Sequence, residues 1–587
     1  MRKAILTIAI GWTLFSCSEE NNTLNPSDSV LQEQGYVKLM LCLPEGAGLT
    51  TKSANDQFVD GQAEEYALRD GLIAYFQSDS NNPDRDAQFV KAQPLDLGDW
   101  NRAGSDQNLT TKQTCVVNAP LPEEGQQLYA LVILNRNQVV TLTTEGELFV
   151  GDKAVERLAD LQQPYTSSVF DWIGEEANSF FMANAPVADR PVAQAVFPPK
   201  VNLLTAVEYT RDYPTAEQPA QPIYVERAVA KVEVAVSGQR TINADGTVTL
   251  PVEGQTNHQL ILTGWRLNRT NRTTKPVRDV TGYAQWATYS NPEAKTTLNR
   301  FFGTEPNPYR VYWAVDGNYG DAPVDALESY AQQHFVVTAD EDGDWLPLYQ
   351  DTETSVAYCP ENTTTADEMR TALLTGVVVA SRYQLPTGET NAEGDLFTMG
   401  HSTAVYGVSK LEQTINQCLY RSGTKAYHFR RGEGTEGDVI DTPACYATYF
   451  YTEAGEAMTE ADAQILLANA YVGTINFYRG GKSYYQTMPI LHFGDYYTPV
   501  TGTESFTDSA HLGRFGVVRN HWYVIYIEGV NSPGYPVKPD PKPDPDPGID
   551  PDPTPIPTPD PSPDTGYGLR TVIHVKPWTV RYQEVEF

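Results

Sequence analysis

The chain has 587 residues and a formal net charge of −33. Its length exceeds what one hydrophobic core normally serves, so two large domains and a tail are expected. The negative charge excludes nucleic-acid binding, which needs a concentrated basic surface, and docking on anionic membranes by charge alone. Abundant Tyr, Thr and Val between Gly, Pro, Asn and Asp breaks favour a β-rich fold.

The first seventeen residues have the pattern of a bacterial lipoprotein signal. Arg2 and Lys3 precede a short apolar run over 4–15, which is too short to cross a bilayer and fits a signal peptide. The run ends in Leu-Phe-Ser-Cys, which resembles a lipobox, and the acidic patch Ser-Glu-Glu at 18–20 resembles a surface-export signal of Bacteroidetes lipoproteins. We predict cleavage before Cys17 and two or three acyl chains on it as an anchor. An ordinary signal peptide with an incidental cysteine is the alternative.

The remaining cysteines do not form a metal-binding pattern. Their spacing contains no CxxC, and no histidine cluster accompanies them, so a zinc site is not expected. Their odd number excludes full pairing within one chain, and we favour buried thiols over a mixed set with one or two disulfides. They are Cys42, Cys115, Cys359, Cys418 and Cys445.

The N-terminal half shows a polar leader over 18–34 and then a series of strand patterns. Residues 35–44 form an apolar strand candidate, and an exposed loop carrying Lys52 follows. Residues 64–77 begin as a short helical turn and continue as a strand, whereas 152–161 place apolar side chains at helical spacing. Further strands are expected at 114–117, 127–135, 179–182 and 192–203.

The C-terminal half reads as short, turn-bounded strands, which are typical of sandwiches or barrels. Residues 223–236 alternate apolar and polar side chains over their second half, and we expect the domain boundary just before or within them. One helical segment is expected at 460–470. Strands are expected at 259–268, 309–315, 376–382, 472–477, 484–493 and 521–530.

The tail consists of a tether and a final strand pattern. The tether, 536–565, has proline at nearly every second position, so it can form neither sheet nor helix and favours extended polyproline II. The residues after it, 568–587, are rich in strand formers, and a lone strand is unstable in water. It must therefore complete a sheet either in its own chain or in another molecule.

The side chains of the last ten residues alternate in a way that suits strand insertion. Trp578, Val580 and Tyr582 share one face of an extended chain and are candidate anchors for pockets. Val585 and Phe587 fall in the opposite phase, so a bulge or a second short strand is expected there.

Several local sequences, in order along the chain, together resemble the fimbrillins of the Bacteroidales, the type V pilins, particularly the minor-fimbrium (Mfa-type) branch. Pieces such as EEYALRDGLIAYF, YALVILNRN and FFMANAP carry the resemblance in the first half. The later pieces are IYVERAVAKVEV, GWRLNRTN, RVYWAVDGNY, YCPENT, INFYRGGKSYYQTMPILHFG, GVVRNHWYVIYIEGV and VKPWTVRYQEVEF.

The resemblance implies a fold and an assembly mechanism. Members have two transthyretin-like β-sandwich domains and reach the surface as lipoproteins. A trypsin-like protease cuts the loop after the first strand, and the opened groove accepts the C-terminal strand of the next subunit. The family's cut usually follows arginine, whereas here the matching bond joins Lys52 and Ser53.

We therefore expect a mainly β protein with minor helices and the following plan. Residues 1–17 are a signal peptide, and 18–52 are a leader and first strand removed on maturation. Residues 53–222 and 223–535 are two β-sandwich domains, 536–565 are a linker, and 566–587 are a donor strand.

No motif suggests an enzyme, and neither a cofactor nor a metal is expected. The eight histidines are scattered, and no HExxH, GxSxG or Walker-type loop occurs. His492 and His521 are interpreted as hydrogen-bonded structural residues, and 340–344 as an acidic turn.

The predicted function is that of a surface fimbrial subunit that polymerises by strand exchange and supports adhesion and biofilm formation. Its partners would be other copies of itself, accessory fimbrial subunits, a maturation protease, the outer membrane before cleavage, and host or bacterial surface ligands. The alternatives are a fimbrial anchor or a tip adhesin, and a surface glycan-binding lipoprotein.

Overall fold

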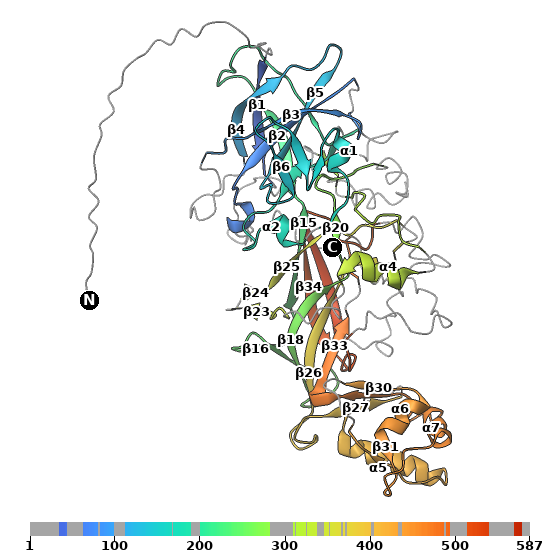
Figure 1. The fold of residues 1–587 in the computed structure, drawn as a ribbon. Helices are drawn as coiled ribbons and strands as arrows, with labels where there is room; N and C mark the ends of the chain where they lie inside the picture. The colour runs from blue at the N-terminus through green and yellow to red at the C-terminus, as the bar shows by residue number, and fades with distance from the viewer. Residues whose placement is uncertain are drawn as a thin grey trace, which may run out of the picture.

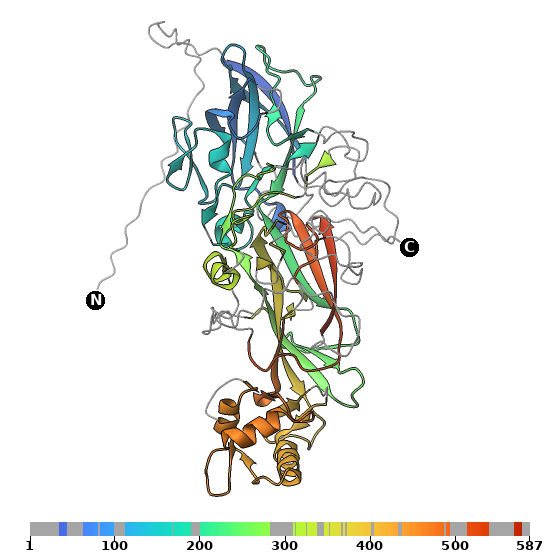
Figure 2. The ribbon, with the colours of Figure 1, turned by 90° about the vertical axis from the view of Figure 1, so that its right-hand side faces the viewer.

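A computed structural model shows an elongated molecule with three parts along its length (Figures 1 and 2). A sheet containing β1 lies at one end, a sandwich of two sheets lies in the middle, and a module rich in short helices lies at the other end. The structure describes residues 34–43, 63–79, 83–98, 112–166, 168–188, 200–281, 309–311, 313–323, 326–336, 345–350, 353–365, 368–369, 373–400, 404–431, 437–486, 489–492, 513–538 and 569–577.

The N-terminal part is built on a sheet with the strand order β3-β2-β5-β10-β14-β1-β4, with β13 paired to β5. Its strands are β1 (Gln34–Cys42), β2 (Gly71–Ser78), β3 (Gln88–Pro94), β4 (Lys112–Pro120), β5 (Gln127–Leu134), β10 (Met182–Asn184), β13 (Thr205–Ala206) and β14 (Gln221–Arg227). The two ends of this sheet curl towards each other, so that β2 and β3 come close to β4. Tyr75 of β2 and Gln93 of β3 both donate hydrogen bonds to the carbonyl of Asn118 in β4, each at 2.7 Å.

Curling places one hydrophobic core inside the sheet. β5 is almost wholly buried, and its core residues pack with Val37 and Leu39 of β1 and with Phe180 and Phe181. Short elements border this core: η1 (Ala63–Tyr66), β6 (Val140–Leu142), β7 (Leu148–Val150), β8 (Lys153–Ala154), α1 (Leu158–Leu161), β9 (Tyr165–Thr166), α2 (Phe170–Ile173), β11 (Val187–Ala188) and β12 (Val201–Asn202).

The central part is a sandwich of two sheets. One has the order β25-β15-β34-β35 and the other the order β16-β17-β18-β26-β33, and Val232, Ile525, Leu260 and Val379 belong to the core that both sheets share. The strands are β15 (Val229–Val236), β16 (Thr241–Ile242), β17 (Val248–Pro251), β18 (Gln259–Asn268), β25 (Val356–Pro360), β26 (Gly376–Gln384), β33 (Lys482–Gln486), β34 (His521–Val530) and β35 (Leu569–Pro577).

Smaller elements lie beside this sandwich. They are β19 (Thr270–Asn271), β20 (Thr273–Thr274), β21 (Tyr309–Arg310), α4 (Leu327–His334), β22 (Phe335–Val336), β23 (Tyr349–Gln350) and β24 (Glu353–Thr354). Both β21 and β20 pair with strands of the N-terminal part, β11 and β9 respectively. These pairings join the two parts away from the main connection.

The main connection between the two parts is a single run of chain. β14 belongs to the N-terminal sheet, β15 belongs to the central sandwich, and only Ala228 separates them. Buried ion pairs surround this crossing, namely Glu65–Lys231 at 2.6 Å, Glu226–Arg278 at 2.8 Å and Glu361–Arg519 at 2.5 Å.

The helical module is inserted between β26 and β33 and has its own core. Leu411, Ile415 and Leu419 recur every fourth residue of α5, so one face of that helix is apolar and packs on Phe477 and its neighbours. The elements are β27 (Leu396–Met399), β28 (Tyr406–Gly407), α5 (Val408–Arg421), β29 (His428–Phe429), β30 (Asp438–Ile440), α6 (Pro443–Tyr449), β31 (Phe450–Tyr451), α7 (Glu460–Leu467), β32 (Ile475–Tyr478) and η6 (Arg479–Gly481).

The expectation of a mainly β protein with minor helices is confirmed, and two local predictions are wrong. The segment 152–161 is not one helix: Lys153–Ala154 pairs with β7, and only Leu158–Leu161 is helical. The expectation of one helix in the C-terminal half overlooked α4, α5 and α6. No helix among the described residues is long and apolar enough to cross a membrane.

Candidate assembly site

The first strand, β1, is held on both sides by strands from later in the chain. It pairs antiparallel with β4 along its whole length, from Gln34 opposite Pro120 to Cys42 opposite Lys112. On its other side, Leu39 to Cys42 pair in parallel with the beginning of β14. β1 therefore occupies an interior position of the sheet although it comes first in the sequence (Figure 1).

One face of β1 forms part of the hydrophobic core. Val37, Leu39 and Leu41 are at most 1% exposed, and Leu43, just after the strand, is fully buried. Alternate residues of a strand point to opposite faces, so this spacing places the three side chains in one row of core positions. Without β1, these positions would be empty, and the backbone groups of β4 and β14 that pair with it would lose their partners.

The opposite face of β1 lies under residues 208–220, which we call the strap. The backbone of Tyr36 exchanges two hydrogen bonds with Thr210, at 2.7 and 2.9 Å, and its ring contacts that of Tyr213 edge-on at 5.3 Å. The ammonium of Lys38 donates to three strap carbonyls, those of Thr215 and Ala216 at 2.9 Å and that of Gln218 at 2.7 Å. The strap thus binds β1 through backbone groups and one cation.

On the β4 side, a cysteine lies directly opposite the centre of β1. Cys115 is the partner of Leu39 and is a free thiol. Burial raises the pKa of the Cys115 thiol to about 11, because the thiolate loses hydration in this environment. The thiol is therefore protonated and unreactive at neutral pH.

The C-terminal strand, β35, pairs with its own chain. It runs antiparallel to β34, from Leu569 opposite Val530 to Pro577 opposite His521, and it is the edge strand of its sheet. The red ribbon of β35 lies beside that of β34 in the middle of the molecule (Figure 2). Proline has no backbone N–H, so Pro577 cannot donate to the ladder at its end.

Several predicted site residues lie outside the described part of the chain. These are the lipidation residue Cys17, the maturation residues Lys52 and Ser53, and the donor-strand residues Trp578, Val580, Tyr582, Val585 and Phe587. Their roles stay predictions. In the sequence, residues 44–62, which include Lys52, come after β1 and Leu43, and the last ten residues come after β35.

The histidines singled out in the sequence are structural residues. The Nδ1 atom of His492 lies 2.9 Å from the hydroxyl of Tyr523, and that of His521 lies 3.0 Å from the carbonyl of Arg519. Both histidines are buried. Among the described residues, no group of three or more His, Cys, Asp or Glu side chains could hold a metal ion.

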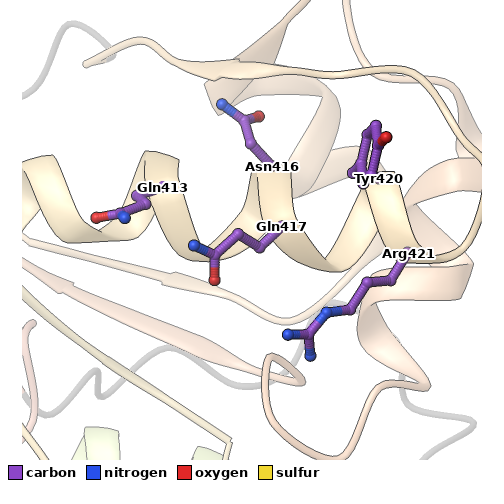
Figure 3. Close-up of a pocket in the computed structure, with 5 residues that line it drawn as sticks. All are labelled: Gln413, Asn416, Gln417, Tyr420 and Arg421. Carbon is purple, nitrogen blue, oxygen red and sulfur yellow. The ribbon is translucent and has the colours of Figure 1, made fainter.

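Sequence reasoning did not find a shallow pocket at the far end of the helical module. It has a volume of about 360 Å³ and is lined by Gln413, Asn416, Gln417, Tyr420 and Arg421 of α5, whose side chains project from one side of the helix (Figure 3). Tyr420 is 85% exposed, and Tyr471 elsewhere on the module is 81% exposed. In the sequence, these polar residues are spaced so that they lie on the side of a helix opposite Leu411, Ile415 and Leu419. That spacing could have revealed the polar face.

A family comparison identifies the C-terminal region. Residues 476–584 match the model of the fimbrillin C-terminal domain, described as major fimbrial subunit protein type IV. This region is similar to the C-terminal domain of fimbrillins. The fimbrillin match runs from β32 through β33 and β34 to β35 and beyond, so it includes the C-terminal strand as well as sandwich strands. It confirms the resemblance recognised in the sequence and relates the chain to fimbrial subunits.

Solved structures of similar proteins were also found. A putative cell adhesion protein from Parabacteroides distasonis shares 9% identity, with 94% of this chain and 99% of that chain covered and a TM-score of 0.34. A fimbrilin from Porphyromonas gingivalis shares 10% identity, with 93% and 98% covered and a TM-score of 0.33.

The tip fimbrial protein Mfa3 of Porphyromonas gingivalis shares 9% identity with this chain, with 85% and 95% covered and a TM-score of 0.29. No relative was found among curated proteins. At these TM-scores the structural similarities carry no conclusion about function, and the identification rests on the family match.

Proposed function

We propose that the chain is a structural subunit of a surface fimbria that polymerises by protease-triggered donor-strand exchange and supports adhesion and biofilm formation. The observation that carries the proposal is the position of β1. It contributes a row of core side chains and pairs with both β4 and β14. In the sequence it comes shortly before Lys52, the proposed cleavage residue. One cut after that residue separates β1 from the rest of the domain.

The proposed pathway begins with an outer-membrane precursor. Lipid on Cys17 anchors it, and a trypsin-like protease cuts between Lys52 and Ser53. The cut removes the anchor and β1 together, and the groove between β4 and β14 then needs a replacement strand. A strand from a second molecule supplies both backbone hydrogen bonds and alternate side chains, as in other β-strand additions.

The proposed donor segment is shorter than the 566–587 expected from the sequence, because 569–577 pairs with β34 of its own chain as β35. It is 578–587, the ten residues that follow β35. β35 completes the sheet of its own sandwich and ends at Pro577, so it can serve as the attachment point of the donor. The donor has ten residues and β1 has nine. Trp578, Val580 and Tyr582 have the spacing of the three core residues of β1, while Val585 and Phe587 would lie on the other face.

Assembly of this kind defines the partners. Each subunit would bind two other subunits, one through the groove left by β1 and one through its own tail, and accessory fimbrial subunits would use the same contacts. Host or bacterial surface molecules are the proposed targets of the finished fimbria.

The test is to cut purified full-length protein at Lys52 and look for ladders that resist SDS. We expect ladders after cutting, a new N-terminus at Ser53, and no ladders when residues 578–587 are deleted. Lys52→Gln should block both cutting and ladder formation, and Lys52→Arg is the matched control that preserves both. Ladders that persist without 578–587 would overturn the proposal.

A second candidate function, that of a tip adhesin or a surface glycan-binding lipoprotein, is favoured by the module that carries α5. Its exposed tyrosines and side-chain amides could stack on and hydrogen-bond to sugars. A surface glycan-binding lipoprotein would keep an intact lipidated N-terminal peptide on every surface copy, which mass spectrometry of shaved cells would detect.

A further inference from the structure

We propose that the three strap carbonyls around Lys38 form a recognition site for a basic side chain of the incoming donor strand, and that Arg581 of a second copy occupies it. The consequence is a defined register and direction: the donor runs opposite to the direction of β1. This inference rests on the proposed strand exchange and adds the position of each donor residue in the groove left by β1.

The carbonyl site is held by the strap itself. The backbone N–H of Gln218 bonds to the carbonyl of Thr215 at 3.3 Å, and the side-chain oxygen of Gln218 accepts from the N–H of Thr215 at 2.7 Å. These bonds close a turn that does not involve β1. When β1 leaves, the turn therefore still presents carbonyl oxygens that lack the cation they had in the precursor.

The donor segment has one side chain that can replace Lys38. Within 578–587 the sequence is WTVRYQEVEF, and Arg581 is its only basic residue. A guanidinium carries five N–H donors in a fixed fork and no acceptor, so it can bond to several carbonyls at once. The hydroxyl of Thr579 could satisfy only one of them.

Placing Arg581 at the Lys38 position leaves two alignments, one in each direction. In the reversed alignment, Tyr582, Val580 and Trp578 take the positions of Val37, Leu39 and Leu41. All three core positions then receive apolar side chains.

In the alignment that runs with β1, Arg581 at the Lys38 position forces Glu584 into the position of Leu41. That position is 1% exposed and lies in the core, where an unpaired carboxylate is strongly unfavourable. The same alignment places Trp578 at Gly35, where even a Cβ atom would lie 3.0 Å from the ring of Tyr209. The reversed alignment places Glu584 there instead. Gly35 is also buried, and Tyr209 has to move for either side chain, by less for Glu584 than for the larger indole of Trp578.

Side-chain size also favours the reversed direction. The cut at Lys52 removes fully buried Leu43 as well as Leu41, so the widest empty space is at that end of the groove. The reversed alignment places Trp578, the largest donor side chain, in this space. β1 pairs antiparallel with β4 along its whole length and in parallel with β14 over Leu39–Cys42. A reversed donor would therefore pair in parallel with β4 and antiparallel with β14.

Disulfide trapping distinguishes the directions. Thr114 of β4 lies opposite Met40, and Asn118 lies opposite Tyr36, the position that Thr579 takes in the alignment that runs with β1. In the reversed alignment Thr579 takes the place of Met40, and neighbouring strands bring paired Cα atoms within disulfide range. In cut full-length protein carrying Cys115→Ala, the pair Thr579→Cys and Thr114→Cys should give a covalent ladder without reductant, whereas Thr579→Cys with Asn118→Cys, the pair for the alignment that runs with β1, should not.

The outcomes separate this inference from the proposed function. A covalent ladder from the Asn118→Cys pair alone, or from neither pair while SDS-resistant ladders still depend on 578–587, would overturn the register but leave strand exchange standing. Ladders independent of 578–587 would overturn the proposed function itself. Single-cysteine variants are the controls for the remaining native thiols.

A substitution tests the cation directly. Arg581→Gln should raise the rate at which cut subunits dissociate from the polymer by at least about tenfold, because charge-assisted hydrogen bonds to the strap carbonyls are lost. Arg581→Lys should restore most of the stability, and Gln583→Ala, next to the anchor residues, should have little effect. An unchanged release rate for Arg581→Gln would contradict the assignment of Arg581.

Discussion

The carboxylate of Glu65 lies 2.6 Å from the ammonium of Lys231, and both side chains are buried. Tyr358 donates to the same carboxylate oxygen at 2.9 Å, and the backbone carbonyl of Glu65 accepts from Arg227 at 3.0 Å. Glu65 belongs to η1, which resumes the described chain after the loop containing Lys52. The segment that follows the proposed cut is therefore fastened to the central sandwich independently of β1.

Breaking the Glu65–Lys231 pair should destabilise the protein strongly. Glu65→Gln or Lys231→Met leaves one buried charge without its partner, which costs on the order of 3–5 kcal/mol of unfolding free energy. Urea unfolding followed by tyrosine and tryptophan fluorescence measures this loss. The exposed pair Arg157–Asp86 at 3.3 Å is the control, and Arg157→Gln should cost about 1 kcal/mol or less. Equal effects at both sites would contradict the assigned role.

Leu39→Ala should destabilise the precursor but not the assembled form. Leu39 is fully buried, and truncating such a leucine costs about 2–5 kcal/mol. Once β1 is removed, the substituted residue is no longer part of the particle. Leu131→Ala in β5, which is also fully buried, should weaken both forms. Thermal unfolding of uncut and cut, assembled protein compares them, and a weakened Leu39→Ala polymer would argue that β1 is retained.

Cys115 should report opening of the groove. Because burial raises its pKa to about 11, labelling of the precursor by a thiol reagent should be slow at pH 8 and should rise about tenfold per pH unit up to that pKa. Removal of β1 exposes the thiol, which lowers its pKa towards the ordinary value and speeds labelling at pH 8. Insertion of a donor should slow labelling again.

Peptide mass spectrometry can follow each cysteine separately in the Cys115 experiment. Cys359 is the matched control, because it is buried in the central sandwich and its pKa is raised to about 12 by burial. Its labelling should stay slow before and after the cut. Equal labelling of Cys115 in cut and uncut protein would show that the groove does not open.

Two truncations should separate the roles of the tail. Deleting 578–587 leaves β35 on β34, so the melting temperature of the precursor should hardly change although assembly is lost. Deleting 569–587 removes the ladder from Val530 to His521 and exposes the edge of β34. We expect a melting temperature lower by several degrees for the longer deletion, measured by circular dichroism. The same melting temperature for both truncations would show that β35 does not stabilise its own sandwich.

Many elements were predictable because local patterns encode them. The strands at 259–268 and 521–530 occur as expected, since their β-branched and aromatic residues suit a sheet. The helix at 460–470 is present as Glu460–Leu467 and begins with Thr459 as its N-cap. The spacing of Leu411, Ile415 and Leu419 predicts α5 equally well, so that helix was overlooked although the signal was present.

Other features depend on contacts between distant segments. Residues 152–161 have helical spacing, but Lys153–Ala154 forms a hairpin with β7, and tertiary pairing overrides the local preference. The carbonyl site around Lys38 has no sequence signature, because backbone groups of Thr215, Ala216 and Gln218 form it. Only the folded strap brings them together.

The sequence by itself determined the kinds of segment in this protein: an apolar first strand, a loop with Lys52, a proline-rich tether and a strand-forming tail. It could not determine the partner of either strand, because alternation specifies which residues of a strand are buried and not which strand lies beside it. Only the tertiary structure placed β1 between β4 and β14 and β35 against β34. Hydrogen bonds between segments far apart in the chain make that choice.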